Sequence, residues 1–255
     1  MSAAACVLVT VARTSGSVPR EVGAWMTVTP CGITGTVGGG HLEFDAIARA
    51  RTALAGGELE GEVRYPLGPT LGQCCGGVVW LRFERIAAGE DLAAHLPQEP
   101  LRPLALFGAG HVGLAIARIT RDLPLALHWI DSRLDQFPAE PPARGWRQEA
   151  LDPPADAVPD LAPGSAVLIM SHSHAEDFDI VAACLKRQRQ RQDLTLIGLI
   201  GSRTKWASFR QRLQARGFTE ADLAQVVCPI GVPGLAGKQP AVIAVAVLAQ
   251  VLALR

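Results

Sequence analysis

The sequence has no excess of charge of either sign. Its 24 lysines and arginines balance 24 aspartates and glutamates, and charged residues make up only 19% of the 255 residues. A nucleic-acid-binding protein needs a basic face for the phosphates, and an anionic membrane surface attracts basic segments. The composition therefore predicts that the chain binds neither nucleic acid nor a membrane.

Paired cysteine motifs and long apolar runs are also missing. The six cysteines form no Cys-x-x-Cys pair, which disfavours a zinc site or a disulfide framework and favours a reducing cytoplasm. No basic segment precedes the apolar residues 1–12, so we expect no signal peptide. The late apolar run 241–254 contains Gln250 and is too short to span a bilayer comfortably, which predicts a buried helix.

The first part of the chain has more predicted strands than helices. The strand predictions cover residues 6–11, 24–29, 33–37, 60–65 and 77–84. An amphipathic helix follows residue 41 and ends at Gly56-Gly57. We therefore predict a small α+β module over residues 1–95, with a proline-containing linker at about 86–102 that lacks regular periodicity.

Three glycines precede the predicted helix of this module. Gly38, Gly39 and Gly40 lead to His41, and bare backbone N–H groups at a helix start favour an anion. The alternative is a tight strand-to-helix turn with a solvent-facing histidine. The polar loop near residues 13–20 also has two interpretations. Its side chains could bind a phosphate or carboxylate, or the loop could simply be solvated; the residues are Arg13, Ser15, Ser17 and Arg20.

Two adjacent cysteines precede the last predicted strand of the module. Gln73, Cys74 and Cys75 lie between glycine steps and lead into the apolar run 78–83. Glycines predict a bent loop whose N–H groups would lower the pKa of a thiol and favour thiolate. The alternative is a pair of buried cysteines beside a turn.

The second half opens with the pattern of a dinucleotide-binding fold. An apolar strand at 103–107 is followed by G-x-G-x-x-G at Gly108, Gly110 and Gly113, and then by an apolar helix. Asp131 ends the next predicted strand, 18 residues beyond Gly113, close to the spacing of an acidic residue that reaches a ribose. We predict a Rossmann-like, doubly wound parallel sheet over residues 103–255.

Polar residues follow two further predicted strands of this half. His172, His174 and Asp177 come after the strand at 166–170 and could bind metal or move protons, or else belong to a helix cap. Arg203 follows the strand at 195–200 and could grip a phosphate or lie on a solvated basic face. Residues 138–163 are proline-rich and are predicted to form a surface connection, and Pro229 predicts that the last strand, at 226–230, lies at an edge.

Taken in order, these motifs resemble the XdhC/CoxI family. The matching segments cover nearly the whole chain, and the pair G-Q-C-C-G-G and G-G-G-H-L-E is far more specific than the glycine fingerprint alone. The segments are Ser15–Arg20, Gly35–Glu43, Leu67–Gly77, Phe107–Gly113, Ile197–Arg203 and Cys228–Gly231.

The resemblance implies a non-enzymatic chaperone for the molybdenum cofactor (molybdopterin). Such a protein protects the cofactor while a cysteine desulfurase helps to install the sulfido ligand, and delivers it to the molybdenum subunit of apo-xanthine dehydrogenase. Molybdenum cofactor biosynthesis proteins are further implied partners, and a homodimer is implied as well. The implied site has Cys74 and Cys75 near the molybdenum. The implied contacts to pterin or phosphate are Gln73, Gly38, Gly39, Gly40, His41, Gly108, Gly110, Gly113, Asp131 and Arg203.

Two other functions remain open at this point. An NAD(P)-dependent oxidoreductase would use the G-x-G-x-x-G site and Asp131, with His111 or His172 as proton donor. A protein-binding assembly factor would need neither glycine-rich site. The first alternative leaves Cys74-Cys75 and the N-terminal module unexplained.

Overall fold

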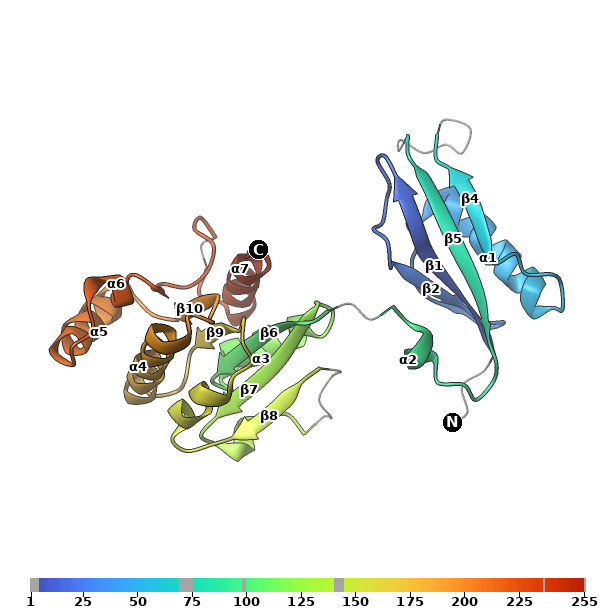
Figure 1. The fold of residues 1–255 in the computed structure, drawn as a ribbon. Helices are drawn as coiled ribbons and strands as arrows, with labels where there is room; N and C mark the ends of the chain where they lie inside the picture. The colour runs from blue at the N-terminus through green and yellow to red at the C-terminus, as the bar shows by residue number, and fades with distance from the viewer. Residues whose placement is uncertain (1–4, 69–75, 98–99, 140–144, 236, 255) are drawn as a thin grey trace. The chain divides into compact units, whose positions relative to one another are not determined.

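The computed structural model describes residues 5–68, 76–97, 100–139, 145–235 and 237–254. The chain forms two compact units, Met1–Glu99 and Pro100–Arg255 (Figure 1). Each unit has a sheet and a hydrophobic core of its own. They are therefore described separately.

Unit 1 is an antiparallel sheet with one long helix on it. The sheet has five strands in the order β3-β2-β1-β5-β4. Val7, Val9 and Val11 alternate along β1 and pack with Leu42 and Ala46 of the helix, which confirms the predicted α+β module. The elements are β1 (Cys6–Ser15), β2 (Trp25–Val28), β3 (Ile33–Gly35), α1 (Gly40–Leu54), β4 (Glu62–Pro66) and β5 (Val78–Ile86).

A short helix lies in the segment for which no regular structure was expected. Helix α2 (Leu92–His95) begins where the Asp91 side chain accepts a hydrogen bond from the Ala93 N–H. Leu92 and Leu96 pack against Leu8 and Ile86 of unit 1. One turn is too short to show helical periodicity in a sequence, which is why this element was missed.

Unit 2 is a doubly wound α/β fold. Its six strands are all parallel and follow the order β11-β10-β9-β6-β7-β8. This is the strand order 6-5-4-1-2-3 of a Rossmann fold, which confirms the predicted fold class. The strands are β6 (Arg102–Phe107), β7 (Leu125–Asp131), β8 (Arg147–Ala150), β9 (Ala166–Ile169), β10 (Leu196–Leu199) and β11 (Val226–Val227).

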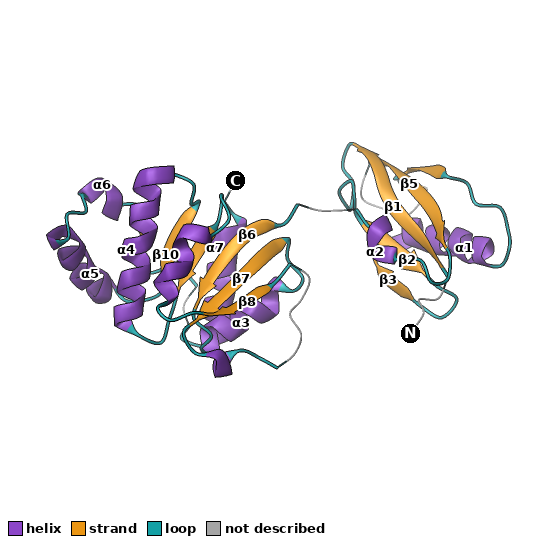
Figure 2. Cartoon of the chain, turned by 60° about the horizontal axis from the view of Figure 1, so that its bottom comes forward, coloured by secondary structure: helices purple, strands orange, loops and turns teal. Residues whose placement is uncertain are grey.

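Helices cover both faces of this sheet (Figure 2). In β6, Leu104 and Leu106 pack on the side of α3 and α7, whereas Ala105 and Phe107 pack on the side of α4 and α5. A strand buried on both faces has no polar alternation, as the sequence of β6 shows. The helices are α3 (His111–Thr120), α4 (His174–Arg191), α5 (Arg203–Ala215), α6 (Glu220–Leu223) and α7 (Pro240–Leu252), with the 3-10 helices η2 (Leu134–Gln136) and η3 (Pro154–Asp160).

The prediction of a surface connection over residues 138–163 is wrong. This segment contains β8, the edge strand of the sheet, and η3, whose Ala157 and Val158 are buried with Leu161. Strand β8 has the polar sequence R-Q-E-A, so it lacks the apolar alternation that marks a strand. Its place at the edge, paired on one side only, explains why such a sequence is tolerated.

The last elements agree with their predictions. Strand β11 is at the other edge of the sheet, and Pro240 opens α7 within its first turn. Helix α7 buries Ala244, Val247 and Val251 against the sheet. In the described part of the chain, no helix combines the length and the hydropathy that crossing a membrane would require.

Candidate functional site

The glycine loop of unit 2 lies where the winding of the sheet changes direction. Strands β6 and β9 are neighbours, and the chain leaves them toward opposite halves of the sheet. Gly108 has φ +120°, and a Cβ there would lie 2.2 Å from the Met170 carbonyl oxygen. A Cβ on Gly113 would lie 2.1 Å from the Gly108 carbonyl oxygen. Both glycines thus allow close approach of backbone to backbone.

Gly110 stands in open space instead. It is the N-cap residue of α3. Among the described residues, no side chain caps this helix start, and a Cβ on Gly110 would meet no atom within 4 Å. The first N–H groups of a helix need a partner, and the helix dipole favours an anionic one. His111, the first residue of α3, is exposed. The contact of a phosphate with this loop stays a prediction.

Asp131 reaches the same loop, but its carboxylate already has partners. One oxygen accepts from the Ala109 N–H at 2.6 Å and from Arg133 Nη2 at 3.1 Å, and the other accepts from Arg133 N and Nε, both at 2.9 Å. Burial alone would raise the pKa of Asp131, but these hydrogen bonds outweigh it and lower the pKa. A ribose hydroxyl would therefore have to compete with Arg133.

A second ion pair is located at the ends of β9 and β10. Lys205 Nζ donates to Asp177 at 2.5 Å and to the Ile200 carbonyl at 3.0 Å. Asp177 also accepts from the N–H and the hydroxyl of Ser171, each at 2.8 Å. The two charged side chains are only 11% and 2% exposed. This pair ties the first turn of α4 to the first turn of α5, the helix after β10.

The metal hypothesis for His172, His174 and Asp177 finds no support in these positions. His172 lies 3.4 Å from Glu176, His174 is exposed, and Asp177 is held by Lys205. Within the described residues, no three histidine, cysteine or acidic side chains are grouped as metal ligands. The capping alternative is confirmed, because the Ser173 hydroxyl accepts from the Ala175 N–H at the start of α4.

Arg203 opens α5 at the same edge of the sheet. Its side chain is exposed, and the neighbouring Ser202 caps the helix by accepting from the Lys205 N–H at 3.1 Å. The Sγ atom of Cys228 lies 4.0 Å from the Ser202 carbonyl oxygen. Arg203 is thus available to a ligand at the end of β10, and its role as a phosphate contact stays a prediction.

The start of α1 in unit 1 differs from that of α3. Gly38, Gly39 and Gly40 all have positive φ, at 134°, 74° and 59°, so the turn itself requires glycine. The Glu43 carboxylate folds back onto it and accepts from the N–H groups of Val37 and Gly39, both at 3.1 Å. His41 is exposed beside this turn. The expected anion position is therefore filled by a side chain of the protein itself.

Burial alone would raise the pKa of Glu43, but hydrogen bonds from the Thr36 hydroxyl and the backbone outweigh it. The pKa of Glu43 is lowered as a result, and the side chain is a carboxylate at neutral pH. An external anion would have to displace it.

Three of the motifs in unit 1 meet at the loop of residues 15–20. The Gly77 N–H donates to the Ser17 carbonyl at 3.1 Å, and a Cβ on Gly77 would lie 2.4 Å from that oxygen. A Cβ on Gly38 would lie 2.5 Å from Pro19 Cγ. The loop at 15–20 therefore contacts both the end of the cysteine motif and the start of α1. Gln73, Cys74 and Cys75 themselves lie outside the described residues.

The arginines of this polar loop already have partners. Arg13 pairs with Glu62 and lies over the Trp80 ring at 4.9 Å, and Arg20 pairs with Glu21 at 3.1 Å. Arg20 also donates to the Thr36 carbonyl at 3.4 Å. Both arginines therefore make contacts within the protein itself.

Sequence reasoning missed two charged residues of the sheet edge, Arg133 and Lys205. Arg133 stands two residues beyond the end of β7. Its position next to Asp131, in the sequence D-S-R, could have indicated an ion pair between the two. Lys205 lies in the first turn of α5, and no local pattern indicates that it reaches a carboxylate 28 residues away. Both are held by buried carboxylates, Asp131 and Asp177.

Comparison with known proteins matches a family model to each of the two units. The model of the XdhC Rossmann domain matches residues 104–251, and the model of the XdhC and CoxI family matches residues 2–66. The uncharacterized protein YqeB of Escherichia coli (strain K12) is 26% identical over 244 residues, or 93% of this chain. The match covers 41% of YqeB, so the chain spans less than half of that relative.

A solved structure shows the same fold in both units. The crystal structure of a xanthine dehydrogenase from Bacillus halodurans superposes with a TM-score of 0.71 at 20% identity. The superposition covers 98% of this chain and 91% of that one. Because the Rossmann-domain model covers more than half of the chain and the second model covers most of unit 1, the chain belongs to the XdhC and CoxI family.

Proposed function

We propose that this chain is a maturation factor for a molybdenum hydroxylase and, more specifically, a chaperone for the molybdenum cofactor. In this role it binds molybdopterin as cargo, protects it while a cysteine desulfurase supplies sulfur, and delivers it to apo-xanthine dehydrogenase. Molybdenum cofactor biosynthesis proteins would load it, and it would act as a homodimer and not as an enzyme. Family membership supports the role, and the meeting of three family motifs at the loop of residues 15–20 is the observation that carries it.

The chemistry of the available donors fits such a cargo. Thiolates are suitable soft ligands for a metal–sulfur centre, which assigns Cys74 and Cys75 to the molybdenum. The other cysteines are less suitable, because Cys6 and Cys184 are buried and burial raises the pKa of both. Cys31 is exposed but lies outside the family motifs, which makes it a matched control.

Of the two glycine-rich helix starts, that of α3 in unit 2 accommodates an anion better than that of α1 in unit 1. The Gly108–Gly113 loop has open space at Gly110 and no side-chain cap, whereas Glu43 fills the turn at Gly38–His41. We therefore propose Gly110 and its neighbours, with Arg203, as the anion contacts within unit 2. Asp131 contributes by holding Arg133 in place.

The test is cofactor retention by the purified, reduced protein. The chain is mixed anaerobically with molybdenum cofactor and desalted, and molybdenum and oxidised pterin are measured in the protein fraction. We expect stoichiometric retention by the native chain and by Cys31→Ala, and a large loss for the Cys74→Ala/Cys75→Ala double variant at an unchanged circular dichroism spectrum.

Two results would contradict parts of this proposal. Unchanged retention in the double variant would exclude the thiolates as ligands while leaving the carrier role intact. No retention by the folded native chain would exclude the carrier role itself. An assembly factor would then be supported if the chain still bound apo-xanthine dehydrogenase after both cysteines had been replaced.

A second candidate is an NAD(P)-dependent oxidoreductase, which the strand order and the open space at Gly110 favour. The pairing of Asp131 with Arg133 opposes recognition of a free ribose hydroxyl, whereas an arginine beside this acidic residue is the feature that accompanies recognition of a 2′-phosphate. Titration of NADH and NADPH, followed by nucleotide fluorescence, distinguishes the two candidates. Tight saturable binding together with dye reduction would favour the enzyme.

A further inference from the structure

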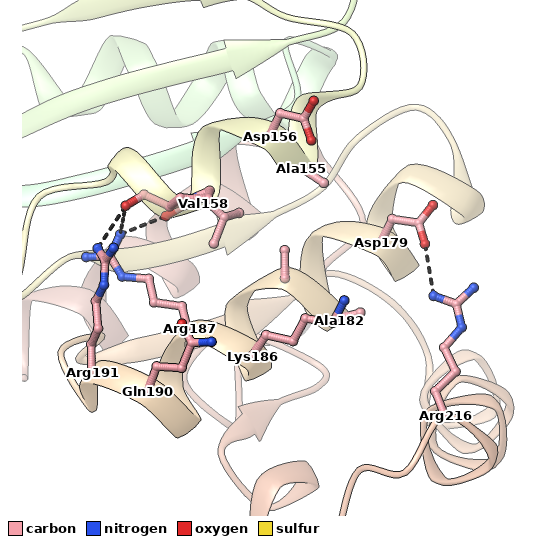
Figure 3. A pocket seen from close by; sticks show the side chains of 12 residues that line it. Ala155, Asp156, Val158, Asp179, Ala182, Lys186, Arg187, Gln190, Arg191 and Arg216 are labelled. Carbon is pink, nitrogen blue, oxygen red and sulfur yellow. Dashed lines mark hydrogen bonds and ion pairs between the residues drawn. The ribbon is translucent and has the colours of Figure 1, made fainter.

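Two hollows of unit 2 border η3 and the chain that follows it. The larger one lies between η3 and α4 (Figure 3). Its arginines make contacts within the protein: Arg187 and Arg191 donate to backbone carbonyl groups of η3, and Arg216 pairs with Asp179 at 3.3 Å. Most of the charge around this hollow is therefore already used by the fold.

The smaller hollow is a pocket on the η3 side of the sheet, near the amino-terminal ends of β6 and β7. It has a volume of about 260 Å³, which is below the range of sites for drug-sized ligands and suits a molecule of one ring. Its apolar wall has surface that a ligand can touch, because Pro103 and Ala126 are half-buried and Ala162 is exposed.

His128 lines this pocket and is held by a carboxylate. Its neighbours in β7, Leu127 and Trp129, pack toward α3 and α7, so His128 points to the face that bears η3. The Nε2 atom of His128 lies 2.7 Å from Glu149 of β8, and Arg147 pairs with the same carboxylate at 3.0 Å. The imidazole, whose side chain is only 17% exposed, is thereby fixed in the wall of the pocket.

The other ring nitrogen of His128 is open. Nδ1 has no hydrogen-bond partner in the described part of the chain. It is also not one of the polar atoms that are fully buried without a partner, so it is accessible from outside the protein. Because the ring lines the pocket and Glu149 takes Nε2, Nδ1 is the nitrogen of His128 that a ligand can reach.

The protonation of His128 decides what this nitrogen can bind. Burial lowers the pKa of His128, so the ring is neutral at neutral pH. Nε2 then carries the proton that it donates to Glu149, and Nδ1 keeps a lone pair. A carboxylate on one nitrogen of an imidazole makes the other nitrogen more basic. The pocket therefore presents a hydrogen-bond acceptor to a ligand.

The charges at the pocket disfavour an anionic ligand. Arg147 is paired with Glu149, and Asp160 makes no ion pair with any of the described residues. The carboxylates thus outnumber the cations, and an anion would be repelled. Asp160 is exposed, so its pairing with a cationic ligand would add little. The half-buried acceptor of His128 therefore selects a neutral donor.

We propose that this pocket binds a small neutral ring compound with one hydroxyl group, of the size of phenol. The hydroxyl donates to His128 Nδ1, and the ring lies against the wall formed by Pro103, Ala126 and Ala162. The site is independent of the proposed cofactor role, because it lies near the amino-terminal end of β6, whereas the Gly108–Gly113 loop follows the carboxyl end of that strand.

Phenol is the probe, and the ring signals of His128 are followed by NMR in the full chain with labelled histidine, assigned by their loss in His128→Gln. At neutral pH we expect a saturable shift of these signals. Fluorobenzene has the same ring without a donor and should bind about ten-fold more weakly, because one hydrogen bond is lost. Lowering the pH should weaken phenol binding, since protonated His128 has no acceptor left.

His95 is the matched control within the same spectra. It also contacts a glutamate, Glu84 at 2.9 Å, but it belongs to unit 1 and lies outside this pocket. Its signals should not follow the phenol titration. Ala162→Phe fills the pocket from an exposed position and should abolish the shift of the His128 signals, with thermal unfolding as the check that this variant is folded.

Three results would overturn the proposal. Phenol could leave the His128 signals of the folded native chain unchanged, or fluorobenzene could bind as tightly as phenol. A phenol-induced shift that persists in folded Ala162→Phe would place the ligand outside this pocket. The comparison of the two probes needs the native chain alone, so it decides the matter even if Ala162→Phe fails to fold.

Discussion

Lys205→Met should destabilise unit 2 far more than removal of an ordinary surface charge. Methionine keeps the aliphatic stem and a similar helix propensity, so the change removes mainly the ammonium group. Asp177 would stay behind, 2% exposed, without the partner at 2.5 Å. Its two hydrogen bonds from Ser171 would remain.

The size of the effect follows from this burial. Removing one partner of a buried ion pair costs about 3–5 kcal/mol, because an uncompensated charge is left in the interior. The remaining contacts with Ser171 place our expectation at about 3 kcal/mol. With a denaturant slope of about 2 kcal/mol per M, the urea midpoint should fall by about 1.5 M.

Hydrogen exchange as a function of urea measures this in the full chain, because peptides from β10 and α5 report on unit 2 alone. Arg210→Met is the control on the same helix. Arg210 pairs with Glu220, but these side chains are 39% and 64% exposed. Such a surface pair contributes at most about 1 kcal/mol.

The double variant Asp177→Asn/Lys205→Met makes the reasoning refutable. It leaves no buried charge at this pair, and the oxygen of an asparagine side chain can still accept from Ser171. Most of the lost stability should therefore return. If Lys205→Met costs no more than Arg210→Met, or if the two changes at the pair simply add, the pair does not act as a buried ion pair.

Three further predictions concern other parts of the chain. Burial lowers the pKa of His128, so the unfolded state binds the extra proton first and stability falls as the pH drops below about 6.5. Urea titrations of His128→Gln should show a smaller fall in stability below this pH. Burial raises the pKa of Cys184 to about 12, so iodoacetamide followed by peptide mass spectrometry should modify the exposed Cys31 long before it. Gly108→Ala should cost about 3 kcal/mol in unfolding experiments because of its φ and the nearby carbonyl. Gly110→Ala should cost at most about 1 kcal/mol, because it meets no atom and changes only the N-cap residue of α3.

The sequence predicts the fold of unit 2 well because its strong signals are local. A buried strand, a glycine turn and an apolar helix each occupy consecutive residues, and the strand order follows from the doubly wound connection. Strand β8 was missed for the opposite reason. Its polar residues are held in the sheet by pairing with β7, which is a tertiary effect.

The sequence could predict where the candidate site lies in the fold. It could not predict which partners the side chains of the site have. Asp131 does reach the glycine loop, as its spacing indicates. The ion pairs Asp131–Arg133 and Asp177–Lys205 depend on the way in which long side chains fold over the ends of neighbouring strands. Spacing along the chain does not encode such contacts.

The two glycine-rich helix starts look alike in sequence but differ in chemistry. At the start of α1, Glu43 supplies a carboxylate that neutralises the backbone N–H groups, and its lowered pKa keeps it charged at neutral pH. At the start of α3, none of the side chains that the structure describes takes that place. An anion must therefore displace a charged group in unit 1, whereas in unit 2 it meets free helix N–H groups. This difference is the physical reason for assigning the phosphate of a ligand to Gly110 and not to Gly39.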